Sequence, residues 1–177
     1  LLHKCAELAE KHLDDRSRAI AAWQRVVAVA PSYVPGLRSL GRLYREEGRW
    51  QALIKLYQAE ADATPAARQS AALLQSVGEI YEHKLEQLNE AIVTYRSVLA
   101  LVPNSSPALR ALARIFRRQG QWEHLIEILK AEADGQSDPQ ERAALMFQVA
   151  AIWEHQLQMI DRSVDAYGRS RRARGAR

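Results

Sequence analysis

The sequence repeats itself at an offset of 72 positions, and this repeat constrains the fold more than any other feature. When the chain is shifted onto itself by that offset without a gap, about a third of the overlapping residues are identical. The shared positions include prolines, glycines, tryptophans and a run of four residues: Pro31 and Pro103, Pro35 and Pro107, Gly48 and Gly120, Trp50 and Trp122, Ala59–Asp62 and Ala131–Asp134. A duplication of this kind is typical of chains built from stacked structural units, each of which buries an apolar face against its neighbours.

Each copy of this repeat contains the periodicity of two helix pairs. Apolar residues recur at spacings of three and four in 37–44 and again in 53–57, which places them on one face of a helix. No alternating β pattern competes with these helices. We therefore predict an all-α fold of about ten helices, each of about 12 to 20 residues, with antiparallel neighbours because the connections are short.

Proline and capping residues predict where several of these helices begin. Pro35 and Pro107 suit first helical turns, where the missing N–H costs nothing. Two further starts are predicted at Thr64–Pro65 and at Asp138–Pro139. Glu141 follows Asp138 by three positions, so these two residues form a candidate capping box.

The helix pairs resemble the tetratricopeptide repeat, a helix–turn–helix unit of about 34 residues. The second and fourth units show the pattern best, on the residues Leu40, Gly41, Tyr44, Gly48, Tyr57 and Pro65, and on Leu112, Ala113, Phe116, Gly120 and Leu129. The alternating units show the part of the pattern that belongs to the second helix and the residue after it: Ala19, Trp23, Val26 and Pro31, and then Ala91, Tyr95, Val98 and Pro103. The double-unit period is similar to that of segments of large bacterial arrays of this repeat.

The resemblance implies a right-handed α-solenoid of antiparallel helix pairs over 1–177. Its repeats are expected at 1–33, 34–67, 71–105, 106–139 and 143–177, the first partial and the last truncated. The odd units depart from the family pattern, because they have one extra residue before the second helix and no turn glycine, as in 85–88. Small residues at Gly41, Gly78, Ala113 and Ala150 are expected to let helices approach closely. Large side chains at Trp23, Tyr95 and Tyr167 are expected to fill the core.

The sequence offers few groups for catalysis or metal binding. Its five histidines form no HExxH pair, and it has neither a phosphate-binding glycine loop nor a GxSxG motif. His83 and His155 recur at equivalent positions, but a metal site would require groups two units apart to converge. With a single cysteine, Cys5, no cysteine cluster is available either. We therefore expect no enzyme activity, no metal and no cofactor.

Charged residues on the first helix of each pair form an alternating pattern. A basic stripe with spacings of four and three occurs in the second unit and recurs in the fourth: Arg38, Arg42 and Arg45, then Arg110, Arg114 and Arg117, with Arg118 beside them. The odd units carry acids at the equivalent stripe: Glu7 and Glu10, Glu79 and Glu82, and Glu154. Because like charges four positions apart destabilise a helix by about 0.2 to 0.5 kcal/mol per pair, something is expected to offset the arginines.

Two interpretations of these stripes stay open, and both can hold together. The first is a ladder of ion pairs between helices, for instance Glu79 with Arg42 and Arg114, which sets register and adds little stability. The second is a partner site made of Arg38, Arg42, Arg45, Glu79, Glu82, Arg110, Arg114 and Arg117, whose guanidinium groups bind carboxylates of an extended peptide. The chaperone-tail clamp of some tetratricopeptide-repeat proteins uses Asn and Lys, and the sequence does not support that specific activity.

The leading functional hypothesis is a scaffold segment that binds a protein or peptide partner, acidic in character, in a groove lined by the first helices. RNA binding by a helical-repeat array is an alternative, against which the acidic stripes argue. A regulatory or docking segment of a larger enzyme is another. The first residue is Leu1, so we expect a piece of a longer protein. No signal peptide or membrane span is visible, which favours the cytoplasm.

The net charge of +4 comes from the end of the chain. Five arginines after position 168 have no acid among them, which leaves 20 basic and 21 acidic residues in 1–168. The repeat correspondence fails in the same segment, where apolar residues give way to Arg169, Arg171 and Arg172. Over 169–177 we expect a polar, partly helical cap, a basic tail or an effect of truncation. An arginine cluster of this kind could contact nucleic acid or acidic surfaces, and we favour a solvated tail. The high pI of the chain therefore does not indicate a nucleic-acid partner.

Overall fold

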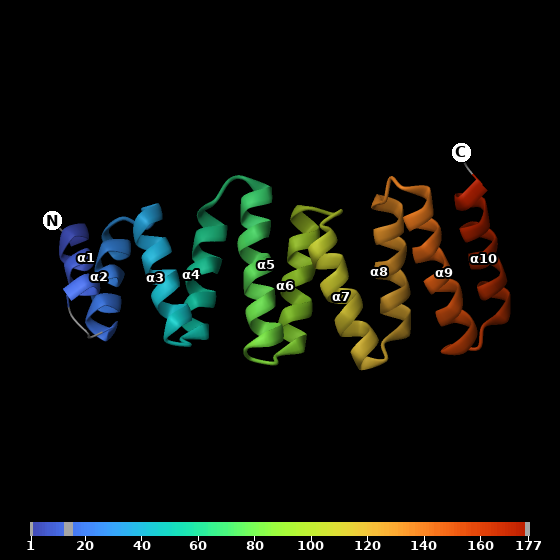
Figure 1. The fold of residues 1–177 in the computed structure, drawn as a ribbon, viewed down its shortest axis with the longest axis horizontal. Helices are drawn as coiled ribbons and strands as arrows, with labels where there is room; N and C mark the ends of the chain where they lie inside the picture. Colours follow the sequence, from blue (N-terminus) through green and yellow to red (C-terminus); the bar gives the residue numbers. More distant parts are fainter. Residues whose placement is uncertain (1, 13–15, 176–177) are drawn as a thin grey trace. The chain divides into compact units, whose positions relative to one another are not determined.

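The computed structural model describes residues 2–12 and 16–175. In this part of the chain all regular secondary structure is helical, and ten α-helices follow one another (Figure 1): α1 (Leu2–His12), α2 (Arg16–Val29), α3 (Val34–Glu46), α4 (Trp50–Ala63), α5 (Ala67–His83), α6 (Leu88–Leu101), α7 (Ser106–Gln119), α8 (Trp122–Gly135), α9 (Pro139–His155) and α10 (Ile160–Gly175). The predicted all-α fold is confirmed. The described helices are 11 to 17 residues long, so the shortest falls just below the expected range.

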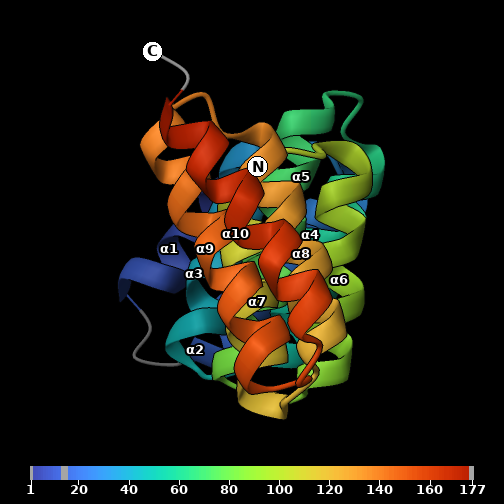
Figure 2. The ribbon, with the colours of Figure 1, turned by 90° about the vertical axis from the view of Figure 1, so that its right-hand side faces the viewer.

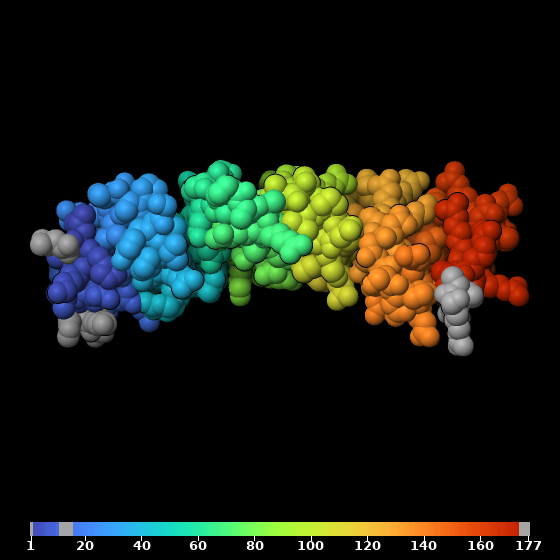
Figure 3. Space-filling view, turned by 90° about the horizontal axis from the view of Figure 1, so that it is seen from above, coloured from blue at the N-terminus to red at the C-terminus, as the bar shows by residue number. Residues whose placement is uncertain are grey.

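The chain forms two compact units, Leu1–Ala91 and Ile92–Arg177, and the boundary between them lies within α6. In the first unit each helix from α1 to α5 packs against the next one along the chain, and in the second unit α7 to α10 do the same. Within each unit the surface follows the chain order, as the succession of colours in Figure 3 shows. The single solenoid over 1–177, with its five repeat boundaries, remains a prediction.

Proline and glycine mark the ends of α3 and α7 as the sequence predicts. Pro35 and Pro107 lie in the first turns of these helices. Gly48 and Gly120 follow them with φ angles of 65° and 67°. This left-handed region is strained for side chains with a Cβ, so glycine is the residue that these two turns need.

The turns after α5 and α9 reach the same left-handed region without glycine. Glu86 and Gln158 have φ angles of 54° and 53°, and they occupy equivalent positions in the two copies of the repeat. These two turns therefore also use a left-handed residue, although neither has a glycine there. Both residues carry the strain that glycine avoids in the even units.

One predicted helix start is confirmed and the other is wrong. The Asp138 side chain caps α9, because its Oδ1 accepts a hydrogen bond of 3.0 Å from the backbone N–H of Gln140. Glu141, its expected capping-box partner, instead accepts a hydrogen bond from the Gln136 side chain. Thr64 ends α4 rather than starting α5, because its hydroxyl donates to the carbonyl of Glu60 at 2.7 Å, and α5 begins only at Ala67.

Each unit has its own apolar core. The most completely buried large side chains of the first unit come from α2, α4 and α5, and those of the second from α6, α7, α8 and α9: Trp23, Ile20, Leu53, Ile54 and Val77, then Tyr95, Val98, Phe116, Leu112, Ile115, Leu125 and Val149. Burying a side chain of this size is worth about 1.5 to 3 kcal/mol. Trp23 and Tyr95 are buried as expected, whereas Tyr167 is only half-buried.

The arginine-rich end of the chain differs from the solvated tail that we favoured. The helix α10 continues to Gly175 and packs along α9 (Figure 2). Ser170 is buried, and its hydroxyl donates a hydrogen bond of 2.8 Å to the carbonyl of Ala143. A small polar residue thus replaces the lost apolar contact and anchors a helical cap. Arg177 lies outside the described residues.

Candidate functional site

A groove in the second unit is the main candidate site. It has a volume of about 580 Å³ and lies between α7, α8 and α9. Four arginines of the α7 stripe line it together with apolar side chains and two polar residues: Arg110, Arg114, Arg117 and Arg118, then Ala113, Leu129 and Leu145, and finally Glu132 and Gln148. The structure thus brings the predicted basic stripe of this unit together on one concave surface.

Two of these arginines contact the polar residues of the groove. Arg110 donates through Nε to Glu132 Oε1 at 3.3 Å, and the Glu132 side chain is largely buried. Arg117 donates through Nη2 to Gln148 Oε1 on α9 at 3.2 Å. Each of these bonds uses one of the five N–H donors of a guanidinium, so both side chains retain donors that can face a ligand.

The equivalent place in the first unit, between α3, α4 and α5, also holds a groove, with a volume of about 480 Å³. Three of its lining residues are the repeat equivalents of lining residues of the second groove: Arg45, Tyr57 and Ser76. The other residues that line it are Trp50, Glu79, Ile80, His83 and Lys84. Arg45 donates to the hydroxyl of Tyr57 at 2.7 Å, so this arginine has a partner on the neighbouring helix α4.

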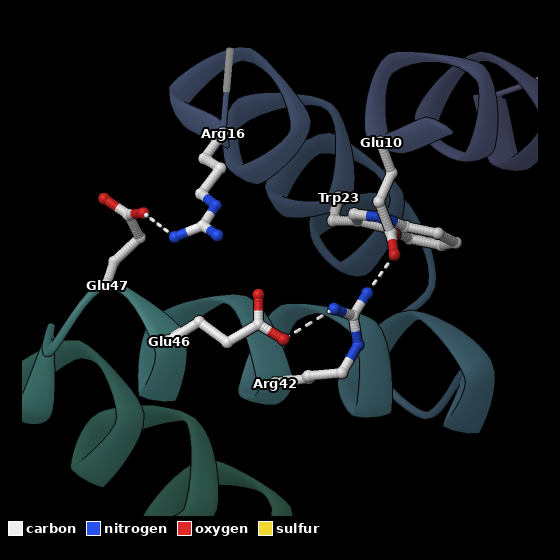
Figure 4. Close-up of polar contacts among 6 residues, drawn as sticks. All are labelled: Glu10, Arg16, Trp23, Arg42, Glu46 and Glu47. Carbon is white, nitrogen blue, oxygen red and sulfur yellow. Dashed lines mark hydrogen bonds and ion pairs between the residues drawn. The ribbon is translucent and has the colours of Figure 1, made fainter. Parts of the chain in front are cut away.

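Arg42 is held by acids of the first unit itself, as Figure 4 shows. It bonds Glu46 one turn along α3 at 2.8 Å and also bonds Glu10 on α1. The indole N–H of Trp23 donates to the second oxygen of Glu10 at 2.8 Å. Beside this network, Arg16 and Glu47 form another ion pair, at 3.1 Å.

The environment of Arg42 shifts its pKa. The hydrogen bond to Glu46 raises the pKa of Arg42 above its ordinary value, burial lowers it in part, and the charge of Glu10 raises it again. The guanidinium is therefore charged throughout the usual pH range and belongs to an internal ion pair.

The predicted pairing of Arg42 with Glu79 is wrong, because the acid that Arg42 reaches is Glu10. Glu79 lines the groove of the first unit and accepts a hydrogen bond of 3.1 Å from Gln75 on its own helix. The ladder interpretation is thus realised between α1 and α3. The pairing of Glu79 with Arg114 would link the two units and remains a prediction.

The remaining residues of the predicted stripes differ in accessibility. Glu82 was expected on the surface but is buried, and the equivalent Glu10 is partly buried. Glu7 lies 3.5 Å from His3 within α1. Arg38 is exposed and lines neither of the two grooves.

The sequence analysis did not predict that acids of the stripe accept hydrogen bonds from aromatic side chains. Glu10 accepts from Trp23, and Glu154 accepts from the hydroxyl of Tyr167 at 2.8 Å. The two acids are separated by two repeat periods, and so are the two aromatic residues, so the alignment of the chain with itself contains the signal. That hydrogen bond raises the pKa of Tyr167 above its ordinary value of 10.0.

A second basic concavity lies at the end of the second unit, between α8, α9 and α10. Its volume is about 460 Å³, and its charged lining residues are Lys130, Asp134, Arg142, Arg169 and Arg172. Its basic residues do not recur at the equivalent positions of the preceding copy, which are Gln58, Ser70, Ser97 and Ala100. This concavity is therefore a local feature of the last helices.

Among the described residues, no group of three or more His, Cys, Asp or Glu residues could hold a metal ion. Within the same residues, no helix is long and apolar enough to cross a membrane.

Comparison with known proteins identifies the repeat. A family model described as the tetratricopeptide repeat matches residues 37–69 and 108–143, which contain most of α3–α4 and α7–α8. These two segments are tetratricopeptide repeats. Both matched segments are even units, in which the turn glycines and the arginine stripes lie. No curated protein matches the sequence.

Solved structures show the same tetratricopeptide-repeat fold. A crystal structure of MamA is 17% identical, with a TM-score of 0.55 over 91% of this chain and 90% of that one. A crystal structure of BtubC from P. vanneervenii is 15% identical, with a TM-score of 0.50 over 99% and 79% of the two chains. At these identities the likeness concerns the fold alone. It extends over nearly the whole of this chain, including the odd units that the family model does not match.

Proposed function

We propose that this chain is a non-catalytic scaffold that binds an extended segment of a partner protein in the grooves of its tetratricopeptide repeats. The observation that carries the proposal is the recurrence of a groove between a first helix, its second helix and the next first helix in both units. A recurring concave surface with apolar side chains and exposed donors suits an extended peptide, whose backbone and side chains need both.

The predicted partner-contacting residues divide into two groups under this proposal. Arg110, Arg114, Arg117, Arg45 and Glu79 line the grooves and are proposed to contact the partner. Arg42 and Glu82 are proposed to have structural roles in the first unit, because Arg42 is ion-paired and Glu82 is buried. Arg38 belongs to neither group, because it is exposed but lines neither groove.

The experiment is a peptide selection followed by mapping of the bound peptide. A random peptide library is selected on the immobilised protein, and a selected peptide is titrated into protein with labelled methyl groups and followed by NMR. The methyl groups of Ala113, Leu129 and Leu145 should shift, because they line the α7–α9 groove. The exposed methyl groups of Val93 on α6 should not shift.

Shifts of the Val93 methyl groups without shifts of Ala113, Leu129 and Leu145 would contradict the proposal, and so would a failure to select any peptide. Binding of a structured RNA in place of peptides would favour the alternative function. In that case the affinity would fall steeply with salt, in proportion to the number of phosphates contacted.

A further inference from the structure

The two equivalent grooves differ in charge, and we infer that the α7–α9 groove binds an acidic extended peptide whereas the α3–α5 groove does not. This inference rests on the proposed function and names the partner class and the preferred groove. It follows from three differences between residues at equivalent positions of the two copies.

The first difference is a reversed charge next to the arginine stripe. In α3 the residue beside Arg45 is Glu46, which bonds Arg42 at 2.8 Å. The equivalent residue of α7 is Arg118, which is exposed and lines the groove. The second groove therefore has a basic residue one turn after Arg114, where the first unit has an acid one turn after Arg42. This added positive charge would attract an anionic ligand.

The second difference concerns the partner of the third arginine in each stripe. Tyr57 of the first unit offers a hydroxyl, which Arg45 uses at 2.7 Å. The equivalent residue of the second unit is Leu129, which has no acceptor and is buried. Arg117 instead bonds Gln148 across the groove that both residues line, and keeps further N–H donors for a ligand.

The third difference is the sum of charges around each groove. Four arginines and one acid, Glu132, line the second groove, for a formal charge of +3. Arg45, Lys84 and Glu79 give the first groove a formal charge of +1 with neutral histidine. A concave surface of one sign concentrates ligands of the opposite sign, and guanidinium groups bind carboxylates through paired hydrogen bonds.

The apolar lining residues identify the ligand as a peptide rather than a nucleic acid. Ala113, Leu129 and Leu145 supply apolar contacts, and no aromatic side chain is among the described residues of this groove. Grooves that bind single-stranded nucleic acid combine positive charge with aromatic side chains on which the bases stack, and this groove has the charge without such aromatic side chains among its described residues. An extended peptide with alternating acidic and apolar residues fits, because successive side chains point to opposite sides.

The test measures binding of a fluorescein-labelled peptide of alternating glutamate and leucine by fluorescence anisotropy, with a glutamine-for-glutamate peptide as the reference. The wild-type protein should bind the acidic peptide at least about tenfold more tightly than the reference. Arg118→Glu should remove about tenfold of that affinity, because it restores the ion-paired pattern of the first unit. Arg118→Gln should give a smaller loss in the same direction, and circular dichroism checks that both variants keep their helices.

Matched variants separate this groove from the net charge of the chain. Glu46→Arg should leave the affinity within about twofold, and the double variant Glu46→Arg/Arg118→Glu, whose net charge equals that of the wild type, should keep the tenfold loss. Arg169→Glu/Arg172→Glu should leave binding unchanged, because those residues line the other basic concavity.

Three results would overturn the inference. They are a double variant that regains wild-type affinity, a loss of binding in the Arg169→Glu/Arg172→Glu variant, and tighter binding of a single-stranded RNA than of the acidic peptide. Tight binding of the glutamine peptide in the same groove would also refute the acidic preference, while the proposed function would stand. If no peptide binds in either groove, the proposed function itself fails.

Discussion

At the scale of single residues, Gly41 occupies a position that does not require glycine. A Cβ built on Gly41 would lie 3.6 Å from side-chain atoms of Leu53 and Leu56, which is ordinary van der Waals contact. The equivalent residue of the second unit is Ala113, which is buried at the same position of α7. The sequence correctly predicts a small residue at this position, but only the structure shows that a methyl group fits.

We predict that Gly41→Ala raises the free energy of unfolding by about 0.5 to 1 kcal/mol, because glycine inside a helix costs that much relative to alanine. Urea denaturation followed by circular dichroism measures the change. The reverse substitution at the equivalent position, Ala113→Gly, should lower the stability by at least the same amount. A destabilised Gly41→Ala variant would mean that α3 and α4 pack more closely than the structure shows.

The Glu154–Tyr167 hydrogen bond gives a prediction for pH. Because the carboxylate raises the pKa of Tyr167, this contact contributes stability that is fully present below the ordinary tyrosine pKa of 10.0 and is lost as the pH rises through the higher folded value. Ultraviolet difference titration should therefore show one tyrosine fewer ionising near this ordinary pKa than in Glu154→Gln. Identical titrations of the two proteins would show that the hydrogen bond does not form in solution.

At the scale of elements, proline, glycine and capping residues predict the ends of α3, α7 and the start of α9 well, because each acts locally. Asp138 caps α9 with its own side chain, and the turn glycines adopt positive φ angles. Thr64 is predicted wrongly because its hydroxyl has two possible uses, as a cap of the next helix or as a partner of the previous turn. Sequence alone cannot choose between them, since the choice depends on how the chain enters α5.

The residue types of Glu86 and Gln158 do not predict that these residues adopt left-handed backbone angles. Their strain can be tested by substitution with glycine. Gln158→Gly should raise the free energy of unfolding by up to about 1 kcal/mol, because a non-glycine residue costs about 1 to 2 kcal/mol in this region and the flexibility of glycine in the unfolded chain cancels part of the gain. Thermal and urea denaturation both measure the change.

A neighbouring residue provides the control for this prediction. Gln156 has a φ angle of −98°, in the ordinary right-handed region, so Gln156→Gly should lower the stability. Equal effects of the two substitutions would contradict a strained turn at Gln158. Glu86→Gly, at the equivalent turn of the first unit, should behave as Gln158→Gly does.

At the scale of the whole molecule, the internal period of the sequence predicts the fold class and places the arginines on one face of α7. It does not predict which of them are engaged internally, because that depends on single differences between the two copies. Glu46 against Arg118, and Tyr57 against Leu129, change the charge and the hydrogen-bond partners around the two grooves. The acids at Glu10 and Glu154 were likewise predicted as surface charges, although aromatic donors bind them.

The central claim is that a partner segment lies in the α7–α9 groove, and blocking that groove tests it most directly. Gln148 is exposed at the groove, and Gln148→Trp should fill the space without disturbing the core. Titration calorimetry with a selected peptide should show at least a tenfold loss of affinity for Gln148→Trp and no change for Val93→Trp on the exposed face of α6. Undiminished binding to a folded Gln148→Trp variant would contradict the claim.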